Sequence, residues 1–137
     1  MAQTYFADAW YFIALLEPRD SHHRNARRLA AALGRKPVVT TEAVLTEVLT
    51  YFSDEGARAR ALAAEAARAA FARFEVVSGD RALFLRALAL YEGRPDKEYS
   101  LVDCLSMQIA RERGITYVLT NDHHFRQEGF SVLNDAP

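Results

Sequence analysis

Four acidic residues stand where a folded chain could bring carboxylates together: Asp8, Glu47, Asp103 and Asp122. Carboxylate oxygens suit Mg²⁺ and Mn²⁺, and clustered carboxylates repel one another unless a divalent cation lies between them. A metal held in this way lowers the pKa of a bound water and neutralises charge that grows on a phosphate. The chemistry that these residues could perform is therefore metal-dependent phosphoryl transfer.

Each aspartate also has a purely structural interpretation. Aspartate at a strand-to-helix junction is a favoured N-cap, and this applies to Asp8. Ser100 and Asp103 form the Ser-x-x-Asp pattern of a capping box, and Asp122 lies near the start of a short predicted helix whose dipole favours a carboxylate. Taken singly these residues need no catalytic explanation, and only their combination indicates a site.

Glu47 lies at the border of an apolar stripe on its predicted helix, beside Val44, Val48 and Tyr51. A carboxylate at such a border is partly withdrawn from water, which costs free energy unless a cation or a donor meets it. A solvated glutamate at the helix edge is the alternative interpretation. Glu42 lies at the opposite border, and its position makes it the weaker candidate.

Strand-like and helix-like segments alternate along the chain. Strands are predicted at 4–7, 37–40, 74–78, 115–119 and 131–133, and helices at 10–16, 20–33, 41–52, 54–74, 79–91 and 100–113, with a short one after residue 122. Such alternation predicts a parallel sheet with helices on both faces. Ligands of these sheets gather at the carboxyl ends of the strands, so Asp8 and Asp122 are expected to meet there.

Length, charge and cysteine content narrow the class of protein. The 137 residues suit one domain, 1–137, and 17 basic against 18 acidic side chains leave RNA contacts to a local patch. The single Cys104 excludes an internal disulfide and a paired-cysteine zinc site, so a reducing cytoplasm is expected. No basic leader and no apolar run of about 18 residues occurs, so we expect neither export nor membrane insertion.

Basic residues concentrate near the second predicted helix. Arg19, Arg24, Arg27 and Arg28 lie there with two histidines, and Arg35 follows. Phosphate contacts from such a group would supply salt-dependent affinity for RNA that is largely independent of sequence. A solvated helix face is the alternative interpretation of each arginine.

Four segments resemble the motifs of the PIN domain family, and within it the VapC-like toxins. They are Phe6-Ala7-Asp8-Ala9, the run from Thr40 to Leu49, Ser100-Leu101-Val102-Asp103-Cys104, and Leu119-Thr120-Asn121-Asp122-His123-His124-Phe125. Each motif is weak by itself. Together they occur in the family's order over nearly the whole chain, with Gly129-Phe130 closing the last block.

The resemblance implies a PIN-like three-layer α/β sandwich with a central parallel sheet of four or five strands. It also implies a Mg²⁺- or Mn²⁺-dependent endoribonuclease, a homodimer, and a small antitoxin protein that blocks the site. Carried over by motif, Asp8 and Asp103 would ligate metal directly, and Asp122 would complete the site directly or through water. Glu47 would hold a second metal or position the attacking water.

The resemblance gives supporting roles to three further polar residues. Ser100 and Thr120 match positions that support the acids by hydrogen bonds, and Asn121 occupies a variable position with at most a supporting role. The adjacent His123 and His124 could contact phosphate or donate a proton, or they could be polar surface. Cys104 is interpreted as a small buried hydrophobe and not as a nucleophile.

Rival functions remain open at the level of the sequence. A phosphatase or receiver-type protein would need a second acid after Asp8, and a dinucleotide-binding protein would need a glycine-rich turn there, but Ala9-Trp10 follows. A non-catalytic PIN-fold interaction module and a PIN nuclease of RNA processing without an antitoxin are the remaining alternatives. Transfer, ribosomal and messenger RNA are all compatible substrates.

Overall fold

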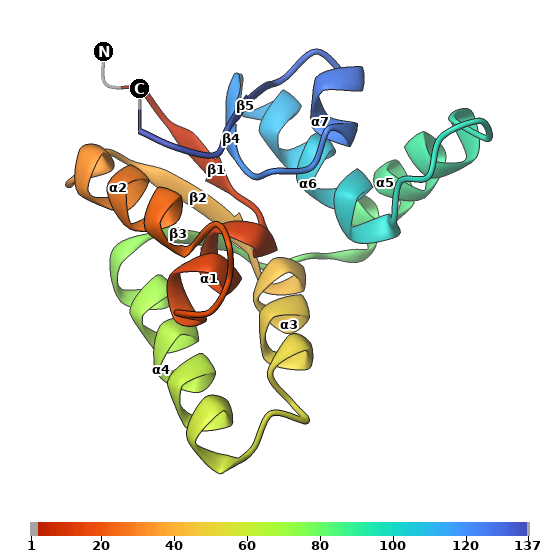
Figure 1. Cartoon of the computed structure of the whole chain (residues 1–137). Coiled ribbons are helices and arrows are strands. Elements are labelled where there is room, and N and C mark those ends of the chain that lie inside the picture. Colours follow the sequence, from red (N-terminus) through yellow and green to blue (C-terminus); the bar gives the residue numbers. More distant parts are fainter. Residues whose placement is uncertain (1–2, 137) are drawn as a thin grey trace.

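Five strands and seven helices make up the part of the chain that the computed structural model describes, residues 3–136. The strands are β1 (Tyr5–Ala7), β2 (Val38–Thr41), β3 (Glu75–Val77), β4 (Tyr117–Leu119) and β5 (Ser131–Leu133). The helices are α1 (Ala9–Leu16), α2 (His23–Leu33), α3 (Glu42–Tyr51), α4 (Ala57–Arg73), α5 (Arg81–Gly93), α6 (Leu101–Glu112) and α7 (His124–Gln127). Their order along the chain is the predicted one (Figure 1).

The strands form one parallel sheet in the order β3-β2-β1-β4-β5. Its centre is covered on both faces, because every residue of β1 and β2 is buried. The sequence of a strand that is covered on both sides does not alternate between apolar and charged residues. The predicted parallel sheet of four or five strands is confirmed with five.

Helices cover both faces of the sheet. Helices α1, α2 and α4 lie on one side, where α1 contacts both of the others, and α5, α6 and α7 lie on the other (Figure 1). Helix α3 contacts α1 and also α6, so it bridges the two layers. The three-layer sandwich expected from the sequence is confirmed, and α3 carries Glu47 to the place where the layers meet.

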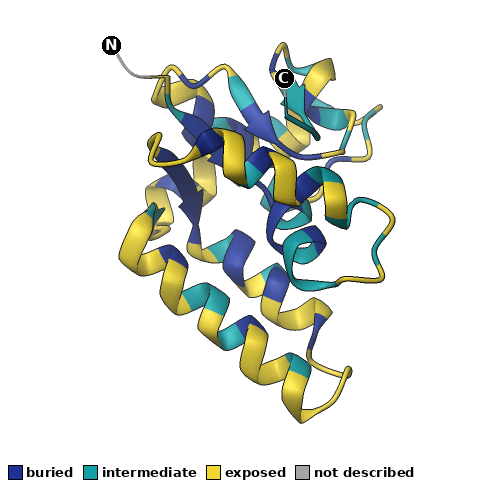
Figure 2. Ribbon diagram, turned by 60° about the vertical axis from the view of Figure 1, so that its left-hand side comes forward, coloured by how far each residue is buried: buried dark blue, intermediate teal, exposed yellow. Residues whose placement is uncertain are grey.

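Buried residues gather in the strands and on the inner faces of the helices, whereas α4 exposes most of its outer surface (Figure 2). On α3 the apolar stripe is narrower than predicted. Val44, Leu45 and Val48 are buried, but Tyr51, which the predicted stripe includes, is 49% exposed and therefore does not belong to the core. No helix within residues 3–136 has the length and apolar content that crossing a membrane needs.

Most element boundaries differ from the prediction by one to three residues, and the largest shifts are at the starts of α2 and α4. Helix α2 begins at His23 because Asp20 forms a turn, in which its side chain accepts the N–H of His22 at 2.8 Å. Helix α4 begins only at Ala57, after Gly56 with φ +95°. β4 begins only at Tyr117, because the Ile115 N–H still closes the end of α6 through the Ala110 carbonyl.

Candidate active site

The centre of the sheet creates a crevice at the carboxyl ends of β1 and β4. From β1 the chain moves to β2 and β3 on one side, and it returns to β4 on the other side. Ligands of open α/β sheets bind at such a switch point. The Asp8 N–H donates to the Leu119 carbonyl at 3.2 Å, which joins the two strand ends. Asp8 and Asp122 thus follow neighbouring strands, as the sequence predicts.

Asp8 is buried at the N-cap position of α1, with 7% of its surface exposed. Its side chain accepts no capping hydrogen bond from α1, so the capping interpretation is wrong for this residue. Instead Thr120 Oγ1 donates to Asp8 Oδ2 at 2.8 Å. Burial raises the pKa of Asp8 to about 6, the Thr120 bond opposes this rise, and the charges of Asp103 and Asp122 add to it.

Glu47 faces the same group of acids from α3. It is half-buried, and burial, together with the negative charges of Asp8 and Asp103, raises its pKa to about 7. Glu42 is exposed and accepts a hydrogen bond from Ser78 Oγ at 3.0 Å. The choice of Glu47 over Glu42 from the helical wheel therefore agrees with the position of the two side chains.

Asp103 is both a helix cap and a member of the acidic group. Ser100 Oγ accepts the Asp103 N–H at 3.0 Å, and Asp103 Oδ2 accepts the Ser100 N–H at 3.1 Å, which completes the predicted capping box. Burial raises the pKa of Asp103, and the charge of Asp122 acts in the same direction. The structural and the chemical interpretation of this residue hold together.

Asp122 is fixed by the turn that links β4 to α7. Its N–H donates to Thr120 Oγ1 at 3.1 Å, and its Oδ1 accepts the N–H of His124 at 2.9 Å. Thr120 therefore contacts Asp8 through its proton and Asp122 through its lone pair. The supporting role expected for Thr120 has a direct geometric counterpart.

The two adjacent histidines differ in their surroundings. The His123 side chain is 70% exposed, as expected of polar surface, but that of His124 is only 17% exposed. His124 Nδ1 lies 3.2 Å from Asp122 Oδ1 and 3.4 Å from Asp103 Oδ2. The interpretation of both histidines as mere surface is wrong for His124, which lies among the acids.

The other predicted site residues lie outside the acidic group. Asn121 Oδ1 accepts a hydrogen bond from Asn134 at 2.9 Å, and its amide lies 3.4 Å from His22 Nε2, so Asn121 links the loop after β4 to its neighbours and not to the acids.

Two of the four arginines chosen as RNA contacts are paired. Arg28 makes a bidentate ion pair with Asp135, and Arg19 pairs with Glu17. Arg24 and Arg27 are exposed on α2. RNA binding by this group stays a prediction.

The donor set suits a divalent metal that prefers oxygen ligands. Within residues 3–136 no arginine or lysine forms an ion pair with Asp8, Glu47, Asp103 or Asp122. Buried carboxylates without a cationic partner are costly, and they take up protons or bind a metal. The raised pKa values of Asp8 and Glu47 express that cost. The residues therefore fit Mg²⁺ or Mn²⁺.

Cys104, which follows Asp103, does not take part. It is fully buried, and burial raises the pKa of its thiol to about 11, so the thiolate is disfavoured. The interpretation as a small buried hydrophobe agrees with the structure.

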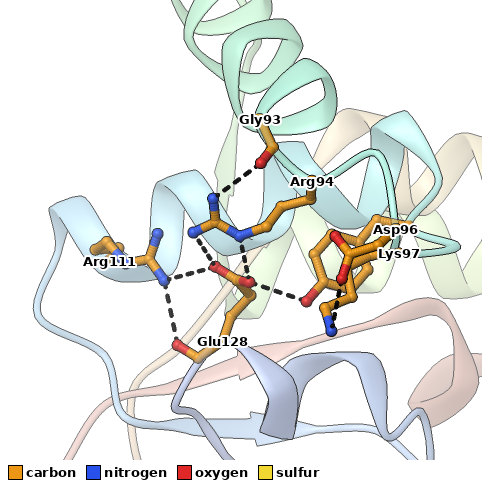
Figure 3. Close-up of polar contacts among 7 residues, drawn as sticks. Gly93, Arg94, Asp96, Lys97, Arg111 and Glu128 are labelled. Atoms are coloured by element: carbon orange, nitrogen blue, oxygen red, sulfur yellow. Dashed lines mark hydrogen bonds and ion pairs between the residues drawn. The ribbon is translucent and has the colours of Figure 1, made fainter.

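A buried carboxylate that the sequence does not reveal supports the site from outside. The Glu128 side chain is 5% exposed and accepts hydrogen bonds from Arg94, Arg111 and the Tyr99 hydroxyl (Figure 3). Burial alone would raise the pKa of Glu128, but these bonds outweigh it and hold the pKa below its usual value. Tyr99 packs edge-on against His124, with ring centroids 5.4 Å apart. Glu128 thus supports the acidic group indirectly, because it holds Tyr99, and Tyr99 packs against His124.

Replacing Glu128 by Gln is expected to lower the free energy of unfolding by about 2 kcal/mol, because charge-assisted hydrogen bonds to a buried group are weakened. Thermal unfolding measures this as a fall of about 6 °C in the midpoint. The matched control is Glu112→Gln, which breaks an ion pair with Arg86 whose side chains are 46% and 35% exposed. The control is expected to cost less than about 1 kcal/mol. Equal losses for the two variants would contradict a special role of the buried carboxylate.

Fold and donor set define an α/β protein with a cluster of carboxylates at the switch point of a parallel sheet. A family model described as PIN domain matches residues 5–130. The chain therefore belongs to the PIN domain family, which confirms the family inferred from the four motifs.

Similar proteins include a characterised nuclease. The chain is 33% identical over 127 residues to the 23S rRNA-specific endonuclease VapC20 of Mycobacterium tuberculosis, which covers 91% of this chain and 94% of the relative. The crystal structure of VapC20, a Sarcin-Ricin loop cleaving toxin, superposes with a TM-score of 0.84 at 26% identity over 93% of this chain and 96% of that one. DNA-bound VapBC from Salmonella typhimurium has a TM-score of 0.65 at 16% identity, over 95% and 96% of the two chains, and shows the likeness of fold alone.

Proposed function

We propose that this chain is a metal-dependent endoribonuclease and the toxin of a toxin–antitoxin pair. The observation that carries the proposal is the gathering of Asp8, Glu47, Asp103 and Asp122 from four separate segments at one switch point, with no arginine or lysine paired to them within residues 3–136. Carboxylates that are withdrawn from water without an arginine or lysine partner are unfavourable unless they serve a cation. Membership of the PIN domain family and the relation to an rRNA endonuclease support the same activity.

Asp8, Asp103 and Asp122 would hold Mg²⁺ or Mn²⁺, and Glu47 would hold a second ion or orient the attacking water. The metal would supply an activated water and charge neutralisation at the phosphate. Thr120 keeps Asp8 Oδ2 and the backbone of Asp122 at fixed positions. Ser100 fixes Asp103 through the capping box. Asn121 keeps only the role of holding the loop beside Asp122.

The RNA would approach over α2, where Arg24 and Arg27 are exposed. Arg19 and Arg28 could contact RNA as well only by sharing or breaking their ion pairs with Glu17 and Asp135. The relative acts on 23S rRNA, so we propose ribosomal RNA as the substrate class and an exposed loop as the cleaved element. An interaction module without catalysis would need none of the buried acids.

A groove that α1 forms with neighbouring helices suits the proposed antitoxin. It encloses about 700 Å³ between α1, α2 and α4, with Tyr11, Phe12 and Phe74 among its apolar walls and the exposed Arg35 and Arg73 at its rim. Apolar walls with a basic rim fit an amphipathic segment that carries acidic residues. The expected homodimer belongs to the same proposal, and the mass of the purified chain in solution tests it.

Purified protein is expected to cut ribosomal RNA into discrete fragments with Mn²⁺ or Mg²⁺ and to leave it intact in excess chelator, because the acids alone cannot activate a water. Gel analysis of RNA incubated under the three conditions measures this. Full cleavage in chelator would overturn the metal mechanism. A folded protein that neither cleaves RNA nor gains thermal stability with Mn²⁺ would favour the interaction module.

A further inference from the structure

A nitrogen ligand lies among the oxygen ligands of the proposed site. His124 is the first residue of α7, and its Nδ1 lies between two carboxylates, 3.2 Å from Asp122 Oδ1 and 3.4 Å from Asp103 Oδ2. Asp103 comes from α6, so the three donor atoms converge from two helices and the turn before α7. Asp122, His123 and His124 also each offer a ligand atom, and these three atoms lie within 4.8 Å of one another.

The Nδ1 atom of His124 is buried. Two carboxylate oxygens lie 3.2 and 3.4 Å from it, but neither meets it in strict hydrogen-bond geometry. Buried polar atoms are rarely left in this state. Ligands at adjacent corners of an octahedron with metal–ligand bonds of about 2.1 Å lie about 3 Å apart. The distances from Nδ1 to the two carboxylate oxygens match that spacing, so one ion could bind all three atoms.

The imidazole ring is held in place by its surroundings. Tyr99 packs against it at an interplanar angle of 62°, and the Tyr99 hydroxyl donates to Glu128 Oε2 at 2.9 Å. Glu128 is in turn fixed by Arg94 and Arg111 (Figure 3). Outer contacts of this kind orient the ligands of metal sites and strengthen binding.

We infer that His124 is a metal ligand through Nδ1 and that it makes the site prefer Mn²⁺ to Mg²⁺. This inference rests on the proposed function, because the ion concerned is the one that the acids would hold. Mg²⁺ strongly favours oxygen ligands and water, whereas Mn²⁺ and the other divalent ions of the first transition series accept imidazole more readily. A site of carboxylates alone would discriminate less between the two ions.

The test is the affinity of the full chain for Mn²⁺ alone and for Mg²⁺ alone, measured by calorimetry on wild type and on His124→Asn. The Asn amide places an oxygen or NH₂ near the position of Nδ1 but offers no imidazole nitrogen. We expect Mn²⁺ to bind the variant at least about tenfold more weakly, with Mg²⁺ binding nearly unchanged. His23→Asn is the matched control, because the His23 ring lies on α2 outside the acidic group, with its Nδ1 2.7 Å from the Ala14 carbonyl oxygen, and it is expected to leave both affinities unchanged.

If a protonated His124 merely forms an ion pair with the two aspartates, the substitution is expected to change metal affinity in the opposite direction. Removing that positive charge would make both ions bind more tightly and leave their ratio as it was, and this result would overturn the inference while the metal site stands. Wild-type protein that binds neither ion would remove the proposed metal mechanism as well. Electron spin echo spectra of Mn²⁺ bound to the wild-type protein test ligation by His124 without any substitution. Modulation from an imidazole nitrogen is expected, and its absence would also contradict ligation by His124.

Discussion

Asp8→Asn is expected to abolish RNA cleavage, with a loss of at least about a hundredfold, while the protein stays folded. Changes to groups that merely support metal ligands already lower activity by about 10–100-fold, and Asp8 is proposed as a direct ligand. Asn keeps an oxygen that can accept from Thr120 Oγ1, which now bonds Asp8 Oδ2 at 2.8 Å. Cleavage of ribosomal RNA in Mn²⁺ by wild type and variant, at equal protein concentration, measures the effect.

Asp80→Asn is the matched control for this substitution. Asp80 also occupies an N-cap position, on α5, but its side chain is a working cap that accepts the Leu83 N–H at 2.8 Å. Asn caps helices about as well as Asp, so this variant should keep both its fold and its cleavage. A folded Asp8→Asn protein that cleaves at the wild-type rate would remove Asp8 from the site.

The order of the elements could be predicted because each strand and helix has a local sequence signal. Short β-branched runs gave the strands, and breakers such as Gly34 and Pro18 marked the ends between them. The boundaries were less certain, because a turn such as that at Asp20 competes with the first turn of a helix for the same hydrogen bonds. At Gly56 a positive φ delays α4, and this glycine after Ser53-Asp54-Glu55 is the signal that could have placed the start of the helix.

The acids of the candidate site could be chosen because their positions follow from chain topology. Asp8 directly follows β1 and Asp122 comes soon after β4, and parallel neighbouring strands must end at the same edge of the sheet. Glu47 was preferred to Glu42 because its position on the helical wheel predicted partial burial, and the structure has it half-buried. Tyr51 shows the limit of the same helical wheel, because the structure leaves this predicted stripe residue 49% exposed.

His124 and Glu128 could not be assigned from the sequence, because their burial depends on contacts between distant segments. Glu128 meets Tyr99 across 29 residues and Arg94 across 34. His124 is withdrawn from water only because α7 packs against α6, while the adjacent His123 stays exposed. No local pattern separates two neighbouring histidines whose surroundings are set by tertiary packing.

Without metal, the stability of this protein is expected to fall as the pH rises from about 5 to about 8. The pKa of Asp8 is about 6 in the folded chain and 3.8 as the ordinary value, so the folded state binds the proton more tightly than the unfolded one. Such a group stabilises the fold below its unfolded pKa, and this contribution is lost as the pH passes through the folded value. The full shift corresponds to about 3 kcal/mol, of which about 1.4 kcal/mol is lost between pH 5 and pH 8.

Glu47, with a pKa of about 7, adds to the fall in the same direction. Carboxyl groups with lowered pKa, such as Glu128, lose their contribution only below about pH 4.5 and do not mask it. Denaturant unfolding in excess chelator at the two pH values measures the change, and Asp8→Asn is expected to reduce it and to leave the part that Glu47 contributes. Saturating Mn²⁺ should reverse the slope, because the ion competes with protons for the same carboxylates and stabilises the fold most at high pH. Two results would contradict the raised pKa of Asp8. One is equal stability of the wild-type protein at both pH values in chelator, and the other is an Asp8→Asn variant that keeps the full pH dependence.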